Sequence, residues 1–318
     1  MKKRFVDELS EGELIQDVFL VKQSSLKTTK SGSLFLSLVL ADRSGPINAV
    51  LWDASRQLYE SFAPDDFIMV RANVEAYMDK PQLVVSHLKR VEEKEISLAD
   101  FLPASDRDPE EMLEELREIV AEVKNPALGA LLKSFFEDEE FAKAFARCPA
   151  AVSLHHAYLG GLLQHTLGVA RMALDVTERY PILDRDILLT GALLHDLGKV
   201  EEIEHHRAFK YSDRGALLGH LTIGAAEVGK RAGAIKDFPP EKLMQIQHLI
   251  LSHHGQFEFG SPKLPMTAEA MALHYLDNLD AKMEALRVAE PVDGNWTGRM
   301  YMFDNRRMFV GQGGEDAK

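Results

Sequence analysis

GALLHDLGK, at residues Gly191–Lys199, is an apolar stretch in which a histidine is followed directly by an aspartate. The pattern around it predicts a buried helix over Pro181–Leu194 that presents His195 and Asp196 at its end. Leaving these two polar side chains unpaired in an apolar interior would cost on the order of a few kcal/mol, so they need partners. A hydrogen-bonded histidine at a capped helix end would supply them, and so would a bound metal ion.

Other histidines and aspartates lie on, or at the end of, segments with helical apolar spacing. In chain order they are His165, the His195-Asp196 pair, His220, the His253-His254 pair and Asp277. Imidazole and carboxylate ligands from separate helices suit Mn²⁺, Fe²⁺, Co²⁺ or Zn²⁺, and one carboxylate can bridge two ions. Two such ions would activate a water and hold the attacking and leaving oxygens of a phosphoryl transfer in line.

This order of ligands resembles that of the HD-domain metal-dependent phosphohydrolases. The stretch HHAYLGGLLQHT, residues His155–Thr166, is similar to one branch, the bacterial YhaM-type 3′→5′ exoribonucleases, which join an OB-fold domain to an HD domain. The resemblance implies a first metal site and a second one that shares Asp196 as a bridge. The first would use His165, His195, Asp196 and Asp277, and the second His220, His253 and His254. One of the last two histidines could instead contact phosphate.

Further residues near these ligands are candidates for other roles. Lys199 follows the His-Asp pair within one turn, where its ammonium could neutralise charge on a phosphate oxygen, and Asp196 and Lys199 are our catalytic candidates. His155 and His156 would contact substrate phosphate or support the ligands. Asp280 either supports Asp277 or is an ordinary carboxylate on a helix surface. The resemblance favours Mn²⁺, as one or two ions, and Fe²⁺ or Co²⁺ would also fit the ligand set.

The segment from Glu13 to Val91 shows the period-two alternation and turn residues of β-strands. The pattern predicts strands over Leu14–Lys22, Leu34–Ala41, Ile47–Trp52, Phe67–Tyr77 and Gln82–Leu88, a loop over Gln23–Ser33 and a helix over Ala54–Phe62. Three strands, a short helix and two more strands is the order of an OB-fold, a small barrel that often binds oligonucleotides.

Aromatic platforms and a few cations would let such a barrel hold a single strand. The candidate platforms are Phe35, which we favour, with Trp52, Phe19 and Tyr77, although core packing of the barrel is the alternative role for each. The candidate phosphate contacts are Lys27 and Lys30, with Arg71 and Lys80, and a solvated loop is the alternative for the lysines.

Residues 96–110 are charged and contain prolines, which predicts a linker between an OB-fold domain over 1–95 and a helical domain over 111–290. Apolar spacing and caps predict helices over Pro109–Lys124, Pro126–Phe136, Glu139–Arg147, Ala150–Tyr158, from the His165 segment to Arg179, Leu217–Arg231, Pro240–Ser252 and Thr267–Glu290. Glu201–Asp213 is polar and predicts a loop. In the C-terminal appendage, residues 291–318, we expect a hairpin around Asp304-Asn305 with strands over Arg299–Phe303 and Met308–Val310, and a disordered tail from Gly311.

Composition excludes some classes of protein. The 318 residues carry a formal net charge of −13, which argues against a protein that coats nucleic acid by bulk electrostatics, but bound cations can offset carboxylates in an enzyme. The single cysteine, Cys148, excludes an internal disulfide and fits a reducing compartment. No stretch has the length and apolarity of a signal peptide core or a membrane span, so we expect a cytoplasmic protein without a membrane partner.

The sequence therefore predicts an all-β OB-fold barrel joined to an all-α HD-domain bundle. By resemblance, it would be a metal-dependent 3′→5′ exoribonuclease that acts on single-stranded RNA, with DNA as a second candidate substrate, and releases nucleoside monophosphates. Two alternatives remain open: a nucleotide phosphohydrolase or cyclic-nucleotide phosphodiesterase that uses the same metals, and a non-catalytic single-strand-binding protein. The aromatic residues of the C-terminal hairpin would also suit contact with a second copy of the chain.

Overall fold

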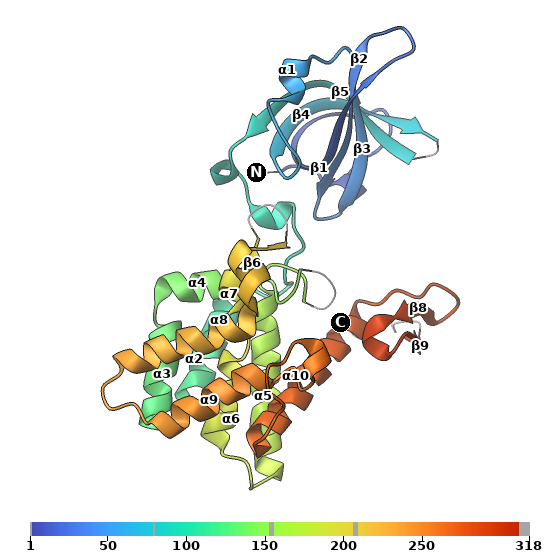
Figure 1. Cartoon of the computed structure of the whole chain (residues 1–318). Helices are drawn as coiled ribbons and strands as arrows, with labels where there is room; N and C mark the ends of the chain where they lie inside the picture. Colours follow the sequence, from blue (N-terminus) through green and yellow to red (C-terminus); the bar gives the residue numbers. More distant parts are fainter. Residues whose placement is uncertain (1, 79, 153–155, 206–208, 312–318) are drawn as a thin grey trace. The chain divides into compact units, whose positions relative to one another are not determined.

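The computed structural model in Figure 1 describes residues 2–78, 80–152, 156–205 and 209–311. The chain divides into two compact units, one that extends to Ala104 and one that begins at Ser105. Each is described here by itself. The first is a β-barrel with short helices, and the second is built from α-helices, with two small strand pairs. This is the fold class that the sequence predicts.

The first unit is a closed barrel with strand order β1-β2-β3-β5-β4, in which the β3–β5 pair is parallel. Its strands are β1 (Leu14–Thr28), β2 (Leu34–Asp42), β3 (Gly45–Leu51), β4 (Phe67–Tyr77) and β5 (Lys80–Val91), with α1 (Arg56–Tyr59) between β3 and β4. Ile68, Val70, Ala72 and Val74 alternate with more exposed residues along β4 and are fully buried, as a barrel wall requires. The OB-fold prediction is confirmed.

One boundary in the barrel was predicted wrongly. Residues 23–28, expected as part of a flexible loop, continue β1 and pair with β2, so that Lys27 lies opposite Phe35. Strand pairing uses backbone groups, so a polar run can extend a hairpin once the neighbouring strand is in register. The chain reverses only at Thr29–Ser33, where Gly32 has a φ of +90°. The helix expected over Ala54–Phe62 is also shorter, since α1 runs only over Arg56–Tyr59, and Phe62 beyond its end packs into the barrel core.

Short 3₁₀ turns flank the barrel: η1 (Val6–Glu8), η2 (Glu93–Glu95) and η3 (Leu98–Asp100). Phe101 follows η3 and is buried, and its ring packs edge-on against Phe67 with centroids 4.9 Å apart. This aromatic contact ties the segment after β5 to the barrel core.

The second unit consists mainly of α-helices. They are α2 (Pro109–Ala121), α3 (Pro126–Phe136), α4 (Glu139–Arg147), α5 (Gly161–Arg179), α6 (Arg185–Leu194), α7 (Lys199–Glu202), α8 (Asp213–Ala234), α9 (Pro240–Ser252) and α10 (Ala268–Arg287), with η4 (Phe257–Phe259) after α9. Asp108, Asn125, Asp138 and Asp184 cap α2, α3, α4 and α6 by accepting hydrogen bonds from backbone amides of the first turn. These caps explain why the helix starts were readable in the sequence, although α6 begins at Arg185 rather than Pro181.

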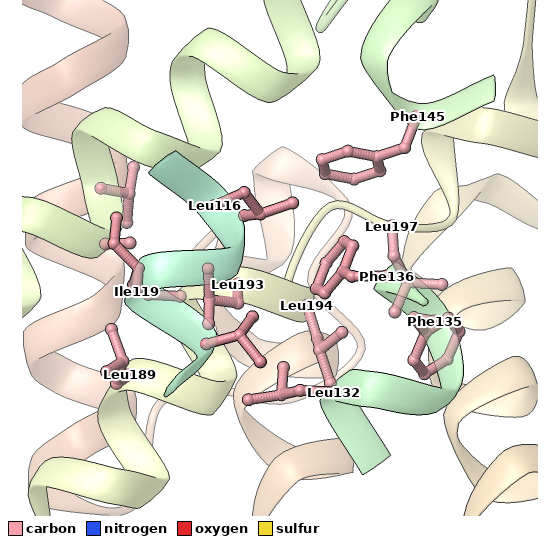
Figure 2. Packing of buried hydrophobic residues seen from close by; sticks show 14 of the residues in the cluster. Leu116, Ile119, Leu132, Phe135, Phe136, Phe145, Leu189, Leu193, Leu194 and Leu197 are labelled. Carbon is pink, nitrogen blue, oxygen red and sulfur yellow. The ribbon is translucent and has the colours of Figure 1, made fainter. Parts of the chain in front are cut away.

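Leucine and phenylalanine side chains from α2, α3, α4 and α6 point toward one another in the core of this unit (Figure 2). Every residue of α6 from Ile187 to Leu194 is buried. Full burial of each large apolar side chain contributes about 1.5–3 kcal/mol. The core therefore fixes α6 firmly, and α6 presents the His-Asp pair at its C-terminal end.

Two segments of the helical unit differ from the prediction. Among residues 150–158, those that the structure describes are not helical, and His156 there has a φ of +49°, which a helix cannot accommodate. Glu201–Asp213, expected as a polar loop, instead contains the end of α7 and the paired strands β6 (Ile203–Glu204) and β7 (Lys210–Tyr211), with residues 206–208 outside the description. Glu202 and Ile203 are buried, which anchors this segment despite its polar composition.

α8 starts earlier than predicted, at Asp213, and is kinked at Gly219, which has a φ of +70°. His220 therefore lies at the start of the second segment of this helix. At the C-terminus, β8 (Trp296–Met300) and β9 (Arg306–Phe309) form a hairpin around Asp304-Asn305, as expected, but both strands begin earlier than predicted. Tyr301–Phe303, expected to end the first strand, instead forms η5. The predicted disordered tail falls on residues 312–318, outside the described residues. No described helix has the length and apolarity that crossing a membrane requires.

Candidate metal centre

The ligand candidates that are far apart in the sequence lie together in the helical unit. His165 is on α5, His195 and Asp196 follow α6, His220 is on α8, His253 and His254 follow α9, and Asp277 is on α10. Groups of these residues offer ligand atoms within 4.8 Å of one another. We call His165, His195 and Asp277 the carboxylate half of the centre, and His220, His253 and His254 the imidazole half.

Backbone carbonyl groups orient three of the rings. His195 and His253 each donate an Nδ1–H hydrogen bond of 2.8 Å to the carbonyl oxygen three residues earlier in the chain. His254 donates in the same way to the carbonyl oxygen of Phe259, also at 2.8 Å. Because a carbonyl oxygen can only accept, the hydrogen of each neutral ring is on Nδ1 and the lone pair is on Nε2.

Carboxylates orient the other two rings. His165 donates from Nδ1 to Asp280 Oδ2 at 2.7 Å, and His220 donates from Nδ1 to Glu202 Oε1 at 2.9 Å. Asp280 Oδ2 also lies 2.9 Å from Nε2 of His156. A carboxylate behind a histidine fixes the ring and raises the basicity of its inner nitrogen, as is common behind metal-binding histidines. All five rings thus turn Nε2 toward the same interior.

The inward-facing Nε2 atoms lie too close together for neutral rings that have no cation between them. The two Nε2 atoms of His165 and His195 are 3.2 Å apart, and those of His220 and His254 are 3.3 Å apart. Two lone pairs at this distance repel unless a cation, either a proton or a metal ion, lies with them. Asp277 Oδ1 adds a carboxylate 3.2 Å from Nε2 of His165.

The two halves differ in how readily a proton could supply the positive charge between the Nε2 atoms. Burial would lower the pKa of His165, but Asp277 and Asp280 raise it to about 10. In the imidazole half, burial and the neighbouring His253 and His220 rings lower the pKa of His254 to about 3, and burial also lowers that of His253. His253 and His254 therefore present neutral nitrogen ligands, which suit a transition-metal ion.

Asp196 lies between the two halves. Its Oδ2 is 3.6 Å and 3.4 Å from Nε2 of His165 and His195, while its Oδ1 is 3.5 Å from Nε2 of both His220 and His253. Oδ1 is buried and has no hydrogen-bond partner among the described residues. A buried, unsatisfied carboxylate oxygen beside imidazole nitrogens is the environment of a metal-bridging ligand, so the residues present fit one or two divalent ions.

Lys199 is the nearest cation to this carboxylate, with Nζ 2.6 Å from Asp196 Oδ2. Burial would raise the pKa of Asp196, but the Lys199 ammonium and His195 hold it well below its usual range. Burial would lower the pKa of Lys199, but Asp196 raises it above its usual value. Lys199 therefore remains a buried cation at the centre, and Asp196 remains ionised.

The candidate RNA contacts belong to the barrel. Phe35 is half-buried and Trp52 is 53% exposed, and their ring centroids are 5.0 Å apart. Lys27 lies opposite Phe35 in the register, and Lys30 is exposed in the turn. Tyr77, Arg71 and Lys80 are also exposed. The proposal of Phe19 as a platform is wrong, because Phe19 is completely buried in the barrel core. His155 lies outside the described residues.

Sequence reasoning missed one supporting carboxylate, Glu202, and gave the other, Asp280, the wrong partner. Glu202 lies in Glu201–Asp213, which was predicted as a polar loop. The structure instead places it at the end of α7, three residues and so about one helical turn after Lys199. Asp280 supports His165 rather than Asp277. No local pattern signals either contact, because each joins segments well separated in the chain.

Comparison with known proteins gives matches over both units. Residues 162–282 match the HD domain family model, and residues 20–91 match an OB-fold nucleic acid binding domain. The chain is 37% identical to "3′-5′ exoribonuclease YhaM" of Bacillus subtilis (strain 168) over 301 residues, 94% of this chain and 95% of that protein. The protein of the same name in Bacillus velezensis is 37% identical over 303 residues, with the same coverage. A solved OB-fold domain of replication protein A from Methanococcus maripaludis covers 29% of this chain and 96% of that one, at 20% identity and a TM-score of 0.24.

Proposed function

Since the chain belongs to the family of 3′-5′ exoribonuclease YhaM, we propose that it is a metal-dependent 3′→5′ exoribonuclease. Its substrate is single-stranded RNA, with single-stranded DNA as a second candidate, and its products are nucleoside monophosphates. The observation that carries the proposal is the position of Asp196, whose two oxygens face two separate groups of inward-turned imidazoles. That arrangement suits the hydrolysis of a phosphodiester.

The carboxylate half with Asp196 would hold one divalent ion, and the imidazole half with Asp196 a second one. We propose Mn²⁺ as the activating ion. When bound, such ions supply an activated water and stabilise negative charge on phosphate oxygens. Asp280 and Glu202 keep His165 and His220 turned inward through hydrogen bonds of 2.7 and 2.9 Å.

Lys199 brings a permanent positive charge to the same site. Its ammonium is buried beside Asp196 and stays protonated, so it needs no proton transfer to act. A buried cation stabilises the extra negative charge that develops on the phosphate more strongly than an exposed one would. No nucleophilic side chain is needed. Cys148 is buried, and burial raises the pKa of its thiol, which makes it a poor nucleophile.

We assign capture of the RNA strand to the barrel, residues 1–95, and hydrolysis to the helical residues 111–290. Phe35 and Trp52 form an adjacent aromatic pair with an exposed indole on which a base can stack, and Lys27 lies beside Phe35. Replacing Trp52 with alanine should raise the KM for an oligoribonucleotide about tenfold, because one stacked base contributes about 1–3 kcal/mol. An unchanged KM would show that Trp52 is not part of the RNA-binding surface.

A degradation assay with Asp196→Ala tests the proposed activity. The wild-type protein with Mn²⁺ should shorten a 5′-labelled single-stranded RNA one nucleotide at a time from its 3′ end. Asp196→Ala should show no hydrolysis while still binding the RNA. The matched control is Asp175→Ala, which removes an exposed carboxylate on α5 and should degrade RNA normally.

Two results would contradict the proposal. RNA degradation by Asp196→Ala at the wild-type rate would exclude the metal centre as the active site. Wild-type protein that leaves RNA intact but hydrolyses cyclic nucleotides or nucleoside triphosphates would show a small-molecule phosphohydrolase instead.

A further inference from the structure

A cavity of about 490 Å³ lies in the helical unit beside the metal centre. Residues spaced three and four apart on α5 and on α10 line it, so it runs between facing sides of these two helices. Asp280 and His156 form part of its wall, and Asp280 also accepts the Nδ1–H of His165. The cavity is therefore next to His165 but on the side away from the inner nitrogens.

Three arginines from separate parts of the chain converge on this cavity. Arg107 precedes α2, Arg171 lies on α5 and Arg287 ends α10. Glu115, only 14% exposed, pairs with Arg107 through one oxygen at 2.5 Å and with Arg171 through the other at 2.6 Å. Buried carboxylates thus hold the guanidinium groups in place from the protein side.

Arg287 is fixed in a similar way. Its Nε and Nη2 donate to the two oxygens of Glu284 at 2.6 and 2.7 Å, and the Tyr158 hydroxyl also donates to Glu284 at 3.2 Å. Each guanidinium carries five N–H donors. Hydrogen bonds to these carboxylates occupy one donor on Arg107 and two on Arg287, while the Arg171–Glu115 contact is an ion pair without a hydrogen bond. The other donors can reach an anion in the cavity without releasing the glutamates.

The remaining walls suit a flat ring. Met283, which is 51% exposed, supplies apolar surface. Gln164 accepts a 2.7 Å hydrogen bond from the Ser105 hydroxyl through Oε1, which fixes its amide group so that Nε2 can donate elsewhere. A volume of about 300–1,000 Å³ with apolar walls and a few fixed polar groups is typical of small-molecule sites. In a chain of net charge −13, clustered guanidinium groups also provide a local attraction for phosphate.

We propose that this cavity binds a nucleoside monophosphate unit, with the phosphate on Arg171 and Arg287 and the base against Met283. The unit is either a nucleotide of the bound RNA or a released mononucleotide, and this choice of sources rests on the proposed exoribonuclease function. The site is distinct from the metal centre, because its ligand contacts arginines rather than the inner histidine nitrogens.

Calorimetric titration of the full-length protein, kept free of metal by a chelator, tests the proposal. AMP should bind at least about tenfold more tightly than adenosine, because charge-assisted hydrogen bonds to phosphate are strong. Arg171→Ala should weaken AMP binding by a similar factor, and Arg171→Lys should recover part of it. Arg171→Ala leaves Glu115 paired with Arg107, so the fold should persist, which a thermal melt checks.

Arg179→Ala is the matched control, since it removes an exposed arginine from the end of the same helix, outside the cavity. It should bind AMP like the wild type. Equal AMP affinity in wild type and folded Arg171→Ala, or equal affinity of the wild type for AMP and adenosine, would overturn the proposal.

Kinetics with RNA then distinguish the two sources. If the cavity holds a nucleotide of the chain, Arg171→Ala should also raise the KM for an oligoribonucleotide. If it holds a released mononucleotide, the KM should stay unchanged and inhibition by added AMP should be lost. If the proposed function is wrong, the wild-type protein with Mn²⁺ will not degrade RNA. The metal-free AMP titration would still test the cavity, because it does not depend on RNA degradation.

Discussion

The carboxylate half and the imidazole half of the metal centre share Asp196 but differ in charge. The carboxylate half contains Asp277 and is supported by Asp280, and both carboxylates lie within 3.2 Å of a nitrogen of His165. The imidazole half has three rings with no carboxylate ligand of its own besides Asp196, among the residues that the structure describes. One centre thus offers a strongly anionic site and a more neutral one, so we expect it to bind two metal ions with unequal affinities.

Replacing one ligand in each half should give the largest changes in Mn²⁺ affinity and so test the difference between the halves most strongly. Asp277→Asn removes a negative charge next to the ion and should lower the Mn²⁺ affinity of the tighter site about a hundredfold. His254→Asn removes a neutral ligand and should weaken the other site about tenfold. Titration of chelator-treated protein with Mn²⁺ measures both, with Asp175→Asn as the control. A larger loss for His254→Asn than for Asp277→Asn would reverse our ranking of the halves.

The supporting carboxylates should give the next largest effects. Asp280→Asn and Glu202→Gln keep the side-chain size but weaken the hydrogen bonds that hold His165 and His220. Each should cost up to about tenfold in metal affinity, the lower end of what loss of such a support costs, and each in its own half only. The same titration, followed by RNA hydrolysis rates, checks this. Equal weakening of both sites by either variant would mean that the halves do not act separately.

The smallest effect is expected at Gly168, one turn beyond His165 on α5. A Cβ atom there would collide with Asp280 Oδ1, so Gly168→Ala should displace Asp280 and weaken the tighter Mn²⁺ site about threefold to tenfold. Gly233→Ala on α8, where a Cβ would meet no atom within 4 Å, is the matched control. Both changes favour helix formation by up to about 1 kcal/mol. Unchanged metal affinity in Gly168→Ala would show that Asp280 can move without effect.

Much of the fold was readable in the sequence because its signals are local. The capping residues Asp108, Asn125 and Asp138 mark helix starts, and alternation along Phe67–Tyr77 marks a strand that the structure confirms. The polar end of β1 was missed because its pairing depends on the backbone of β2 rather than on its own side chains. The non-helical conformation of residues 150–152 and 156–158 was missed because the apolar spacing there imitates a helix.

The candidate ligands could be listed in advance because histidine and aspartate are unusual within apolar helical stretches and at their C-terminal ends. Their supporting contacts could not, since the Asp280–His165 and Glu202–His220 pairs join residues 115 and 18 positions apart. The arginine-lined cavity was equally hidden. Arg107, Arg171 and Arg287 share no motif, and only the packing of α2, α5 and α10 brings them together.

Anomalous diffraction from crystals grown with Mn²⁺ tests the central claim most directly. The account predicts two anomalous peaks, one within coordinating distance of His165, His195 and Asp277 and the other of His220, His253 and His254, with an oxygen of Asp196 on each. Peaks only elsewhere, or none at these ligands in protein that degrades RNA, would contradict it.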